Sequence, residues 1–363
     1  PRPQIFSFAI LLTELYVLEH YMKKKNTKIL YFLPFLSWLM IQLHASLWPM
    51  LFCFWLPFFL NTFSISIGSL FSESKPKKPL FIAFLSMILV AFLNPYGIDS
   101  LFYLFRSISN SSLYHVVTEM RIPDIHTFSG MVSYFCLFLV WLGYLIFTSG
   151  KLQLRHFLLL IGTTYLAISS WRGLAFFLMA AIYPLAYYFR SHFYQVRDLS
   201  FSIRQYIPIV VAIIFLGIIP LTLILSSDGI VMNSANQEGI DYLLKKEDPN
   251  QVRLYCAYGE CSYAEYKGLA VYIDSRAEVF IKENNQQADI LDELFYLQNH
   301  ALNYRNFLEK YQFTHLLVTE DDYLYQLLLH DSDYEVFFSG LESKTSHSMK
   351  KENLRRYIIF KKR

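Results

Sequence analysis

The stretch IPIVVAIIFLGIIPLTLILSSDGIVMNSANQEGIDYLLKKED, residues 207–248, divides the chain into two parts of different composition. Before about Ser226 the sequence is a series of apolar runs, and after it Asp, Glu, Lys and Asn become frequent. Of all 363 residues, 54% are hydrophobic and only 17% are charged, whereas about 25% are charged in a typical soluble domain. We therefore predict an α-helical polytopic membrane domain over 1–226 and a small extracytoplasmic α/β domain over 227–363.

The apolar runs predict about eight membrane-spanning helices. A helix needs about 20 apolar residues to cross the hydrocarbon core of a bilayer. The predicted spans are 4–21, 29–45, 48–70, 80–95, 130–148, 156–171, 173–189 and 206–226. Two of these, 80–95 and 156–171, are short for a span, so each either tilts little or stops at the interface.

Lysine and arginine are distributed unevenly between the connectors of these spans. One set of alternate connectors contains Lys23, Lys24, Lys25, Lys28, Lys75, Lys77, Lys78, Lys151, Arg155, Arg190, Arg197 and Arg204. The other set contains only Arg106, Arg121 and Arg172. Basic connectors tend to stay in the cytoplasm. We therefore predict a multi-pass protein of the cell membrane, with the loop 96–129 and the tail from Ser227 on the outer side.

The predicted outer loop 96–129 is too long for a simple connector. Ile98, Leu101, Phe102 and Phe105 recur at helical spacing, which predicts an amphipathic helix on the membrane surface. The preceding Asn94-Pro95-Tyr96-Gly97 is typical of a turn that ends a helix.

The tail contains short β-branched and aromatic runs that predict strands. They are VRLYCAYG (252–259), LAVYIDSR (269–276), THLLVTE (314–320), YEVFFSG (334–340) and RRYIIFKKR (355–363). Helical spacing occurs around Glu238–Lys246, over 287–312 and over 321–331. Alternating strands and helices favour a small α/β domain with a mixed sheet.

Charged residues alternate along LAVYIDSRAEVF, residues 269–280. In a strand, Asp274, Arg276 and Glu278 would share one face. One interpretation is an ion network that holds the following loop. The other is a ligand-binding cleft at the end of the strand, where open α/β sheets bind ligands. In both cases we expect Asp274 and Arg276 to pair with each other or with neighbouring residues.

Several stretches, in order along the chain, resemble one family. They are RPQIFSFAILLTEL, LHASLWPM, FLNPYGIDSLFYLFR, SSWRGLAFFLMAAIYPL, YIDSRAEVF and FTHLLVTE. They resemble a group of bacterial polytopic membrane proteins with an outward C-terminal domain, which are in turn similar to GT-C-type glycosyltransferases. The resemblance covers nearly all of the chain. It implies transfer of a sugar from a polyprenyl phosphate to an envelope glycan or protein at the outer membrane face.

The resemblance also implies that part of the site precedes Pro1. In GT-C enzymes the carboxylate that activates the acceptor lies in the first outer loop, and this chain begins downstream of that point, so we interpret it as an N-terminally truncated fragment. The family pattern also has a glycine pair where this sequence has Glu260-Cys261.

Sugar transfer requires a carboxylate to deprotonate the acceptor and a cation to stabilise the departing phosphate. Glu119 and Asp124 are the candidate catalytic carboxylates, and His44, Arg121 and Arg172 are the candidate phosphate-binding residues. Each has a structural alternative: a loop carboxylate, an interface histidine, or an arginine that reaches the headgroups.

No cofactor is evident from the sequence. Asp124 and His126 provide two potential metal ligands where a site needs at least three, so a divalent metal is unsupported. There is no basic tract with interleaved aromatic residues, so we predict no nucleic-acid partner.

Two further groups carry chemistry of their own. Glu14 falls within the first predicted span and therefore needs a polar partner or a proton, or has a direct functional role. Cys53 and Cys136 fall in spans, whereas Cys256 and Cys261 are predicted outside the cytoplasm, where a disulfide can form.

Two hypotheses on function follow: a GT-C-like membrane glycosyltransferase, or a non-catalytic membrane protein whose tail binds a glycan or a partner protein. A transporter is less well supported because the spans show no inverted repeat.

Overall fold

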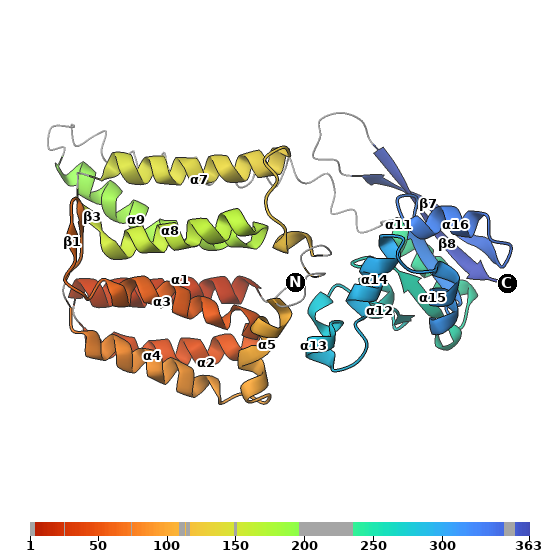
Figure 1. Cartoon of the computed structure of the whole chain (residues 1–363), viewed down its shortest axis with the longest axis horizontal. Helices are drawn as coiled ribbons and strands as arrows, with labels where there is room; N and C mark the ends of the chain where they lie inside the picture. Colours follow the sequence, from red (N-terminus) through yellow and green to blue (C-terminus); the bar gives the residue numbers. More distant parts are fainter. Residues whose placement is uncertain are drawn as a thin grey trace. The chain divides into compact units, whose positions relative to one another are not determined.

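Figure 1 shows the computed structural model of the chain. It describes residues 4–24, 26–73, 75–108, 113, 117–148, 151–195, 235–344 and 353–363. The chain divides into two compact units, which are 1–109 with 117–197 and 110–116 with 198–363. We call them the helical unit and the tail unit. The predicted span 206–226 and the predicted boundary after Ser226 lie outside the described residues.

The helical unit consists of helices that run side by side between its two ends (Figure 1). Its α-helices are α1 (Gln4–Lys24), α2 (Phe32–His44), α3 (Trp48–Leu60), α4 (Lys77–Ala91), α5 (Ile98–Ile108), α7 (Phe128–Phe147), α8 (Leu154–Ser169) and α9 (Trp171–Gln195). The short 3₁₀ helices are η1 (Thr27–Tyr31), η2 (Ala45–Leu47) and η3 (Thr118–Met120). The other seven predicted spans each coincide, wholly or in part, with one of these α-helices.

Within the described residues, four segments are long and apolar enough to cross a membrane. They are Gln4–Lys24, Thr27–Leu60, Phe128–Phe147 and Trp171–Arg190. Leu154–Ser169 is apolar but shorter. These helices support membrane association, whereas the count of eight spans and the orientation stay predictions.

The segment Thr27–Leu60 reverses direction in its middle. Trp48 Nε1 donates a hydrogen bond to Ser37 Oγ over 2.8 Å. In a straight helix these two residues would be about 16 Å apart, at 1.5 Å of rise per residue. The reversal takes place at η2, after His44 adopts φ −158° and ψ 71°. The arms α2 and α3 therefore lie beside each other.

The predicted span 48–70 is wrong beyond Leu60. The helix stops there because polar groups turn the chain: Asn61 accepts a hydrogen bond from the distant Arg155 backbone, and Thr62 Oγ1 donates to the Phe59 carbonyl. The strands β1 (Ser66–Ile67) and β2 (Leu70–Phe71) follow as a hairpin, with Gly68 at φ 57° in its turn.

The two ends of the helical unit carry different connectors. At one end, β2 pairs in parallel with β3 (Leu152–Gln153), which joins the connector after α3 to the connector after α7. At the other end, the Trp171 backbone N–H donates to the Arg121 carbonyl over 3.1 Å. Each of these two contacts joins connectors of the same predicted set, and the orientation of the two ends in the membrane stays a prediction.

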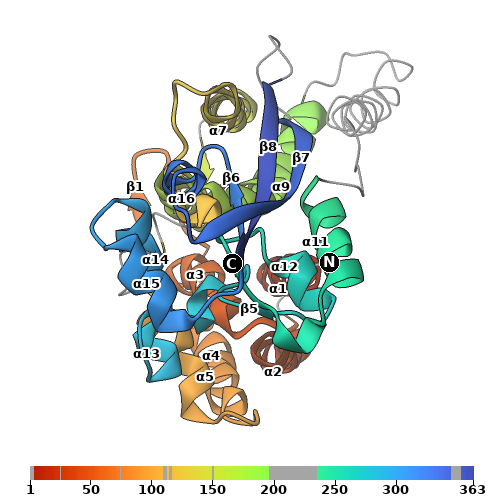
Figure 2. The same ribbon diagram turned by 90° about the vertical axis from the view of Figure 1, so that its right-hand side faces the viewer.

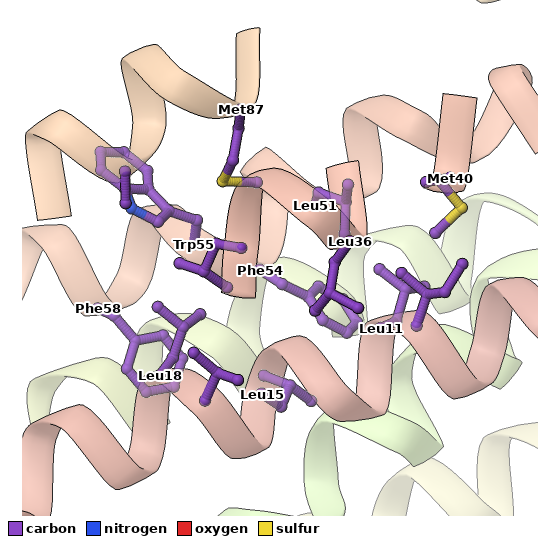
Figure 3. Packing of buried hydrophobic residues seen from close by; sticks show 14 of the residues in the cluster. Leu11, Leu15, Leu18, Leu36, Met40, Leu51, Phe54, Trp55, Phe58 and Met87 are labelled. Carbon is purple, nitrogen blue, oxygen red and sulfur yellow. The ribbon is translucent and has the colours of Figure 1, made fainter. Parts of the chain in front are cut away.

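The core of the helical unit lies between α1, α2 and α3. Leu11, Leu15 and Leu18 of α1 face Phe54 and Phe58 of α3 (Figure 3), and all five are fully buried. Their spacing on α1 is one helical face. Large apolar side chains also cover the outer surface, such as Leu89, Phe138 and Leu145. An apolar exterior suits a lipid environment.

The predicted turn and helix of the loop 96–129 are both present. Asn94 Nδ2 donates to the carbonyls of Ala91 and Gly97, and Asn94 Oδ1 accepts from Ser100 Oγ. Gly97 has φ 56°, which explains the glycine at this turn. Helix α5 follows at once and buries Leu101.

The tail unit has a five-stranded mixed sheet, as predicted. Its order is β5-β4-β6-β8-β7, with β5, β4 and β6 parallel and β8 antiparallel to both its neighbours. The strands are β4 (Arg253–Cys256), β5 (Ala270–Val271), β6 (His315–Thr319), β7 (Tyr334–Lys344) and β8 (Asn353–Lys362). The helices are α11 (Ala235–Lys246), α12 (Ser262–Tyr266), α13 (Lys282–Asn285), α14 (Ile290–Gln298), α15 (Tyr304–Tyr311) and α16 (Tyr323–Leu329), with η4 (Pro249–Gln251) and η5 (Ala277–Val279).

Both faces of this sheet are covered. Figure 2 shows α11 and α12 on one side of the strands and α14 and α15 on the other. On the α11 side, Ile240 and Leu243 pack with Leu317 and Ile359. On the α15 side, rings dominate: Tyr255, Tyr272, Phe307, Tyr311 and Phe313 contact one another.

The predicted strand over LAVYIDSRAEVF is wrong beyond Val271. Strand β5 has two residues, and Asp274 lies in the following loop. The Asp274 carboxylate accepts from the Arg276 backbone N–H over 2.6 Å, which bends the chain into η5. Glu278 therefore lies in a 3₁₀ helix rather than on a shared strand face with Asp274 and Arg276.

Candidate functional site

Glu119 and Arg172, which come from distant segments, form an ion pair. Arg172 Nη2 donates to Glu119 Oε2 over 3.1 Å. The Arg172 side chain is 22% exposed and that of Glu119 38%, so the pair lies at the rim rather than in the core. The buried Nε of Arg172 has no hydrogen-bond partner among the described residues. The guanidinium can therefore donate one more hydrogen bond, through Nε–H, to an oxygen atom of a ligand.

The turn between α8 and α9 fixes the position of Arg172. A Cβ on Gly173 would lie 1.9 Å from the Leu166 carbonyl oxygen, so only glycine allows the two helices to meet this closely. Arg172 is thereby held in the first turn of α9. A cation is unfavourable at a helix N-terminus, and the Glu119 carboxylate offsets that charge.

His44 lies near this pair and interacts electrostatically with Arg172. Its Nδ1 is 2.9 Å from the hydroxyl of Ser7, which is fully buried in the first part of α1. Three of the predicted residues, His44, Glu119 and Arg172, are thus gathered at one end of the helical unit.

Asp124 and Arg121 take other positions. Asp124 Oδ1 accepts from the His126 backbone N–H over 2.9 Å, and the Asp124 carbonyl accepts from Thr127. Asp124 thus shapes the loop before α7, and in the described part of the chain it forms no hydrogen bond with Glu119 or Arg172. Arg121 contributes its backbone carbonyl to Trp171, and its side chain is exposed.

The expected pair of Asp274 and Arg276 is present in the tail unit. Arg276 Nε donates to Asp274 Oδ2 over 3.0 Å, and Arg276 Nη2 also bonds Glu265 Oε1 over 2.6 Å. Asp274 is 2% exposed. Burial alone would raise the pKa of Asp274, but the hydrogen bonds and charge of Arg276 hold it below the usual value. This geometry matches the ion-network interpretation; a role in ligand binding stays a prediction.

The disulfide predicted between Cys256 and Cys261 is formed. It joins the end of β4 to the start of α12, with the two Cα atoms 5.6 Å apart. Cys53 and Cys136 are free thiols.

Sequence reasoning missed a buried charged network at the other end of the helical unit. Glu19 Oε1 accepts from His156 Nε2 at 2.7 Å and from Arg155 Nε at 3.1 Å. Arg155 also donates to Gln153 Oε1 at 2.9 Å and lies 3.8 Å from Glu73. Glu19, Arg155 and His156 are each at most 3% exposed.

This network corrects one assignment. Arg155 is a buried residue of α8 and not an exposed loop cation, and its hydrogen bonds link α8 to Glu19 of α1 and to Asn61 at the end of α3. The sequence holds two signals of this network. One is the dipeptide Arg155-His156 at the start of an apolar run, and the other is the acidic Glu19 within the predicted span 4–21. Neither feature identifies its partner.

Glu14 is fully buried in α1, and neither of its carboxylate oxygens has a hydrogen-bond partner among the described residues. It lies close enough to Cys53 of α3 to affect that thiol electrostatically. Pairing of Glu14 with a polar group is thus not seen in the described part of the chain.

No group of three or more His, Cys, Asp or Glu suited to a metal ion occurs among the described residues. No protein-family model matches the sequence, and no curated protein matches it significantly.

Proposed function

We propose that this protein is an integral membrane glycosyltransferase of the GT-C type, which uses a polyprenyl-phosphate-linked sugar at the outer membrane face. The observation that carries the proposal is the Glu119–Arg172 ion pair beside His44, at one end of an apolar helical unit. A carboxylate and a guanidinium at the edge of the bilayer are the groups that such a transfer needs.

The proposed reaction assigns one role to each residue. Glu119 accepts the proton of the acceptor hydroxyl, whose oxygen attacks the anomeric carbon of the sugar. The bond from that carbon to the phosphate oxygen breaks, and its electron pair leaves with the polyprenyl phosphate. Arg172 stabilises the charge on the departing phosphate through its Nη2 and through its Nε, which has no hydrogen-bond partner among the described residues. His44 helps to hold the phosphate.

The test uses the full chain in lipid nanodiscs with a radiolabelled polyprenyl-phosphate sugar. Arg172→Ala should weaken donor binding by about tenfold or more, which corresponds to about 1.4 kcal/mol. Glu119→Gln should retain binding and lower transfer by about 10²-fold or more. Arg106→Ala, which removes an arginine of the same loop that pairs with Asp99, is the matched control and should leave both unchanged. Wild-type binding and transfer in both site variants would exclude this assignment.

A second function is favoured by a different observation. An open cavity of about 340 Å³ lies at the edge of the tail sheet beside β5, lined by Tyr272, Tyr311 and Phe313 with Arg253. Aromatic walls with few polar groups are typical of sites for small ligands. A non-catalytic protein that binds a glycan through its tail would use this cavity. In that case glycan binding is lost in Tyr311→Ala, and no sugar transfer is detected in the wild type.

A further inference from the structure

A cavity of about 310 Å³ opens at the end of the tail sheet where β6 begins and β8 ends. It is separate from the aromatic cavity beside β5, although Phe313 borders both. Its lining includes three cations, Lys361, Lys362 and Arg363, against one carboxylate, Glu247. The lining is thus positive on balance.

His315 lines this cavity and has an unsatisfied ring nitrogen. The residue is 2% exposed, and its buried Nε2 has no hydrogen-bond partner among the described residues. Buried polar groups in folded proteins are nearly always hydrogen-bonded. A histidine nitrogen without a partner, in a residue that lines a cavity, indicates a ligand atom that the chain does not supply.

The neighbouring threonine determines which nitrogen of His315 carries the proton. Thr314 Oγ1 accepts from the Arg253 backbone N–H at 2.9 Å and lies 3.0 Å from His315 Nδ1. The alternative acceptor for its hydroxyl proton, the Arg253 carbonyl, is 3.4 Å away. Because Nδ1 is the nearer of the two acceptors, the Thr314 hydroxyl is expected to donate to Nδ1 rather than to the carbonyl. Nδ1 then carries no proton, so in a neutral ring the proton is on Nε2. Burial lowers the pKa of His315 to about 4, so the ring is neutral at physiological pH.

The cations around the cavity differ in how far they are already neutralised. Lys361, the cross-strand partner of His315, forms an ion pair with Glu247. Arg363 forms an ion pair with Glu335 at 3.4 Å, but both side chains are more than half exposed, so this contact is weak. Lys362 is exposed, and no ion pair to it is found within the described residues.

We propose that this cavity binds an oxyanion, with His315 Nε2–H as the buried donor and Lys362 and Arg363 as the surrounding cations. A phosphate or a carboxylate supplies the acceptor oxygens that the donor requires and the negative charge that the lining favours. Such a group can come from free phosphate or from an acidic sugar. The proposal does not depend on the glycosyltransferase function.

The test measures binding to the 363-residue chain in detergent by titration calorimetry at pH 7 and constant ionic strength. The probes are inorganic phosphate, glucose 1-phosphate and glucuronate. We expect saturable binding of at least one of them. Tighter binding of inorganic phosphate identifies the free ion as the ligand, whereas tighter binding of glucose 1-phosphate or glucuronate identifies an acidic sugar.

Two variants test the assigned residues. His315→Phe keeps the ring but removes the donor, and it should weaken binding about tenfold or more, whereas His315→Gln should recover part of that loss. Lys362→Met acts at the surface and should also weaken binding without affecting folding. His330→Phe, at an exposed histidine of the same unit, is the control. Absence of saturable binding for all three probes, or wild-type affinity in both His315→Phe and Lys362→Met, overturns the proposal.

Discussion

Glu19 is the residue on which the buried network of the helical unit depends. Glu19→Gln removes the carboxylate beside the Arg155 guanidinium, which is 1% exposed. An uncompensated buried charge costs about 3–5 kcal/mol. We expect a clear fall in the thermal unfolding midpoint of the detergent-solubilised protein. Glu73→Gln is the control, because this carboxylate is 35% exposed and should contribute less. Equal midpoints for Glu19→Gln and the wild type would show that the network is not needed for stability.

Arg276 plays the same part for Asp274 in the tail unit. Arg276→Ala should destabilise this unit by about 1–3 kcal/mol, because a buried carboxylate loses its charged hydrogen-bond donor. Glu265→Ala removes only an exposed partner of Arg276 and should cost less than about 1 kcal/mol. Hydrogen exchange of the segment 270–280 in the full chain measures both.

The pKa of Asp274 gives this prediction a pH dependence. The pKa of Asp274 is lower in the folded protein than in the unfolded chain, where it is about 3.9. The contribution of Asp274 to stability is therefore complete above the unfolded-state pKa and is lost as the pH falls from there through the folded-state pKa. The wild type and Arg276→Ala should therefore converge in acid. A constant difference between them down to the lowest pH would contradict the assigned cause.

At the scale of elements, the disulfide Cys256–Cys261 ties β4 to α12. Alkylation of the unfolded protein without a reductant should modify two thiols, Cys53 and Cys136, and four after reduction. Closing so short a loop stabilises the fold by about 2 kcal/mol in the chain-entropy account. Four modified thiols before reduction would show that the bridge does not form.

Apolar runs locate most helices of the helical unit, because hydrophobic length is visible in the sequence. They also place the reversal at Ala45–Leu47, between the predicted spans 29–45 and 48–70, but they do not show the hydrogen bond between Trp48 and Ser37 that joins its two arms. In the tail, the pattern finds every strand but extends β5 too far. The strand ends early because the Arg276 backbone N–H donates a hydrogen bond to the Asp274 carboxylate, which turns the chain, although the alternating charges favour a longer strand.

The same limit applies to the candidate site. Charge placement predicted that His44, Glu119 and Arg172 share one end, and the structure brings them together. It could not predict that Asp124 shapes its own loop, or that Arg155 is buried by Glu19 and His156, because burial depends on which helices pack together.

At the scale of the whole molecule, the charge pattern and the grouping of connectors lead to the same expectation. The end of the helical unit with Lys24 should face the cytoplasm, and the end with Arg172 should face outward together with the tail. An exposed residue at each place can be replaced by cysteine for labelling. Lys24 lies at the first end of the helical unit, Tyr96 lies at the other end, and Ser332 lies in the tail unit.

The measurement that tests this expectation most directly is cysteine labelling in spheroplasts with a membrane-impermeant maleimide, on a background without Cys53 and Cys136. The account predicts that Tyr96→Cys and Ser332→Cys react from outside, and that Lys24→Cys reacts only after permeabilisation. Labelling of Lys24→Cys in intact spheroplasts, or protection of Ser332→Cys until the membrane is opened, would contradict it.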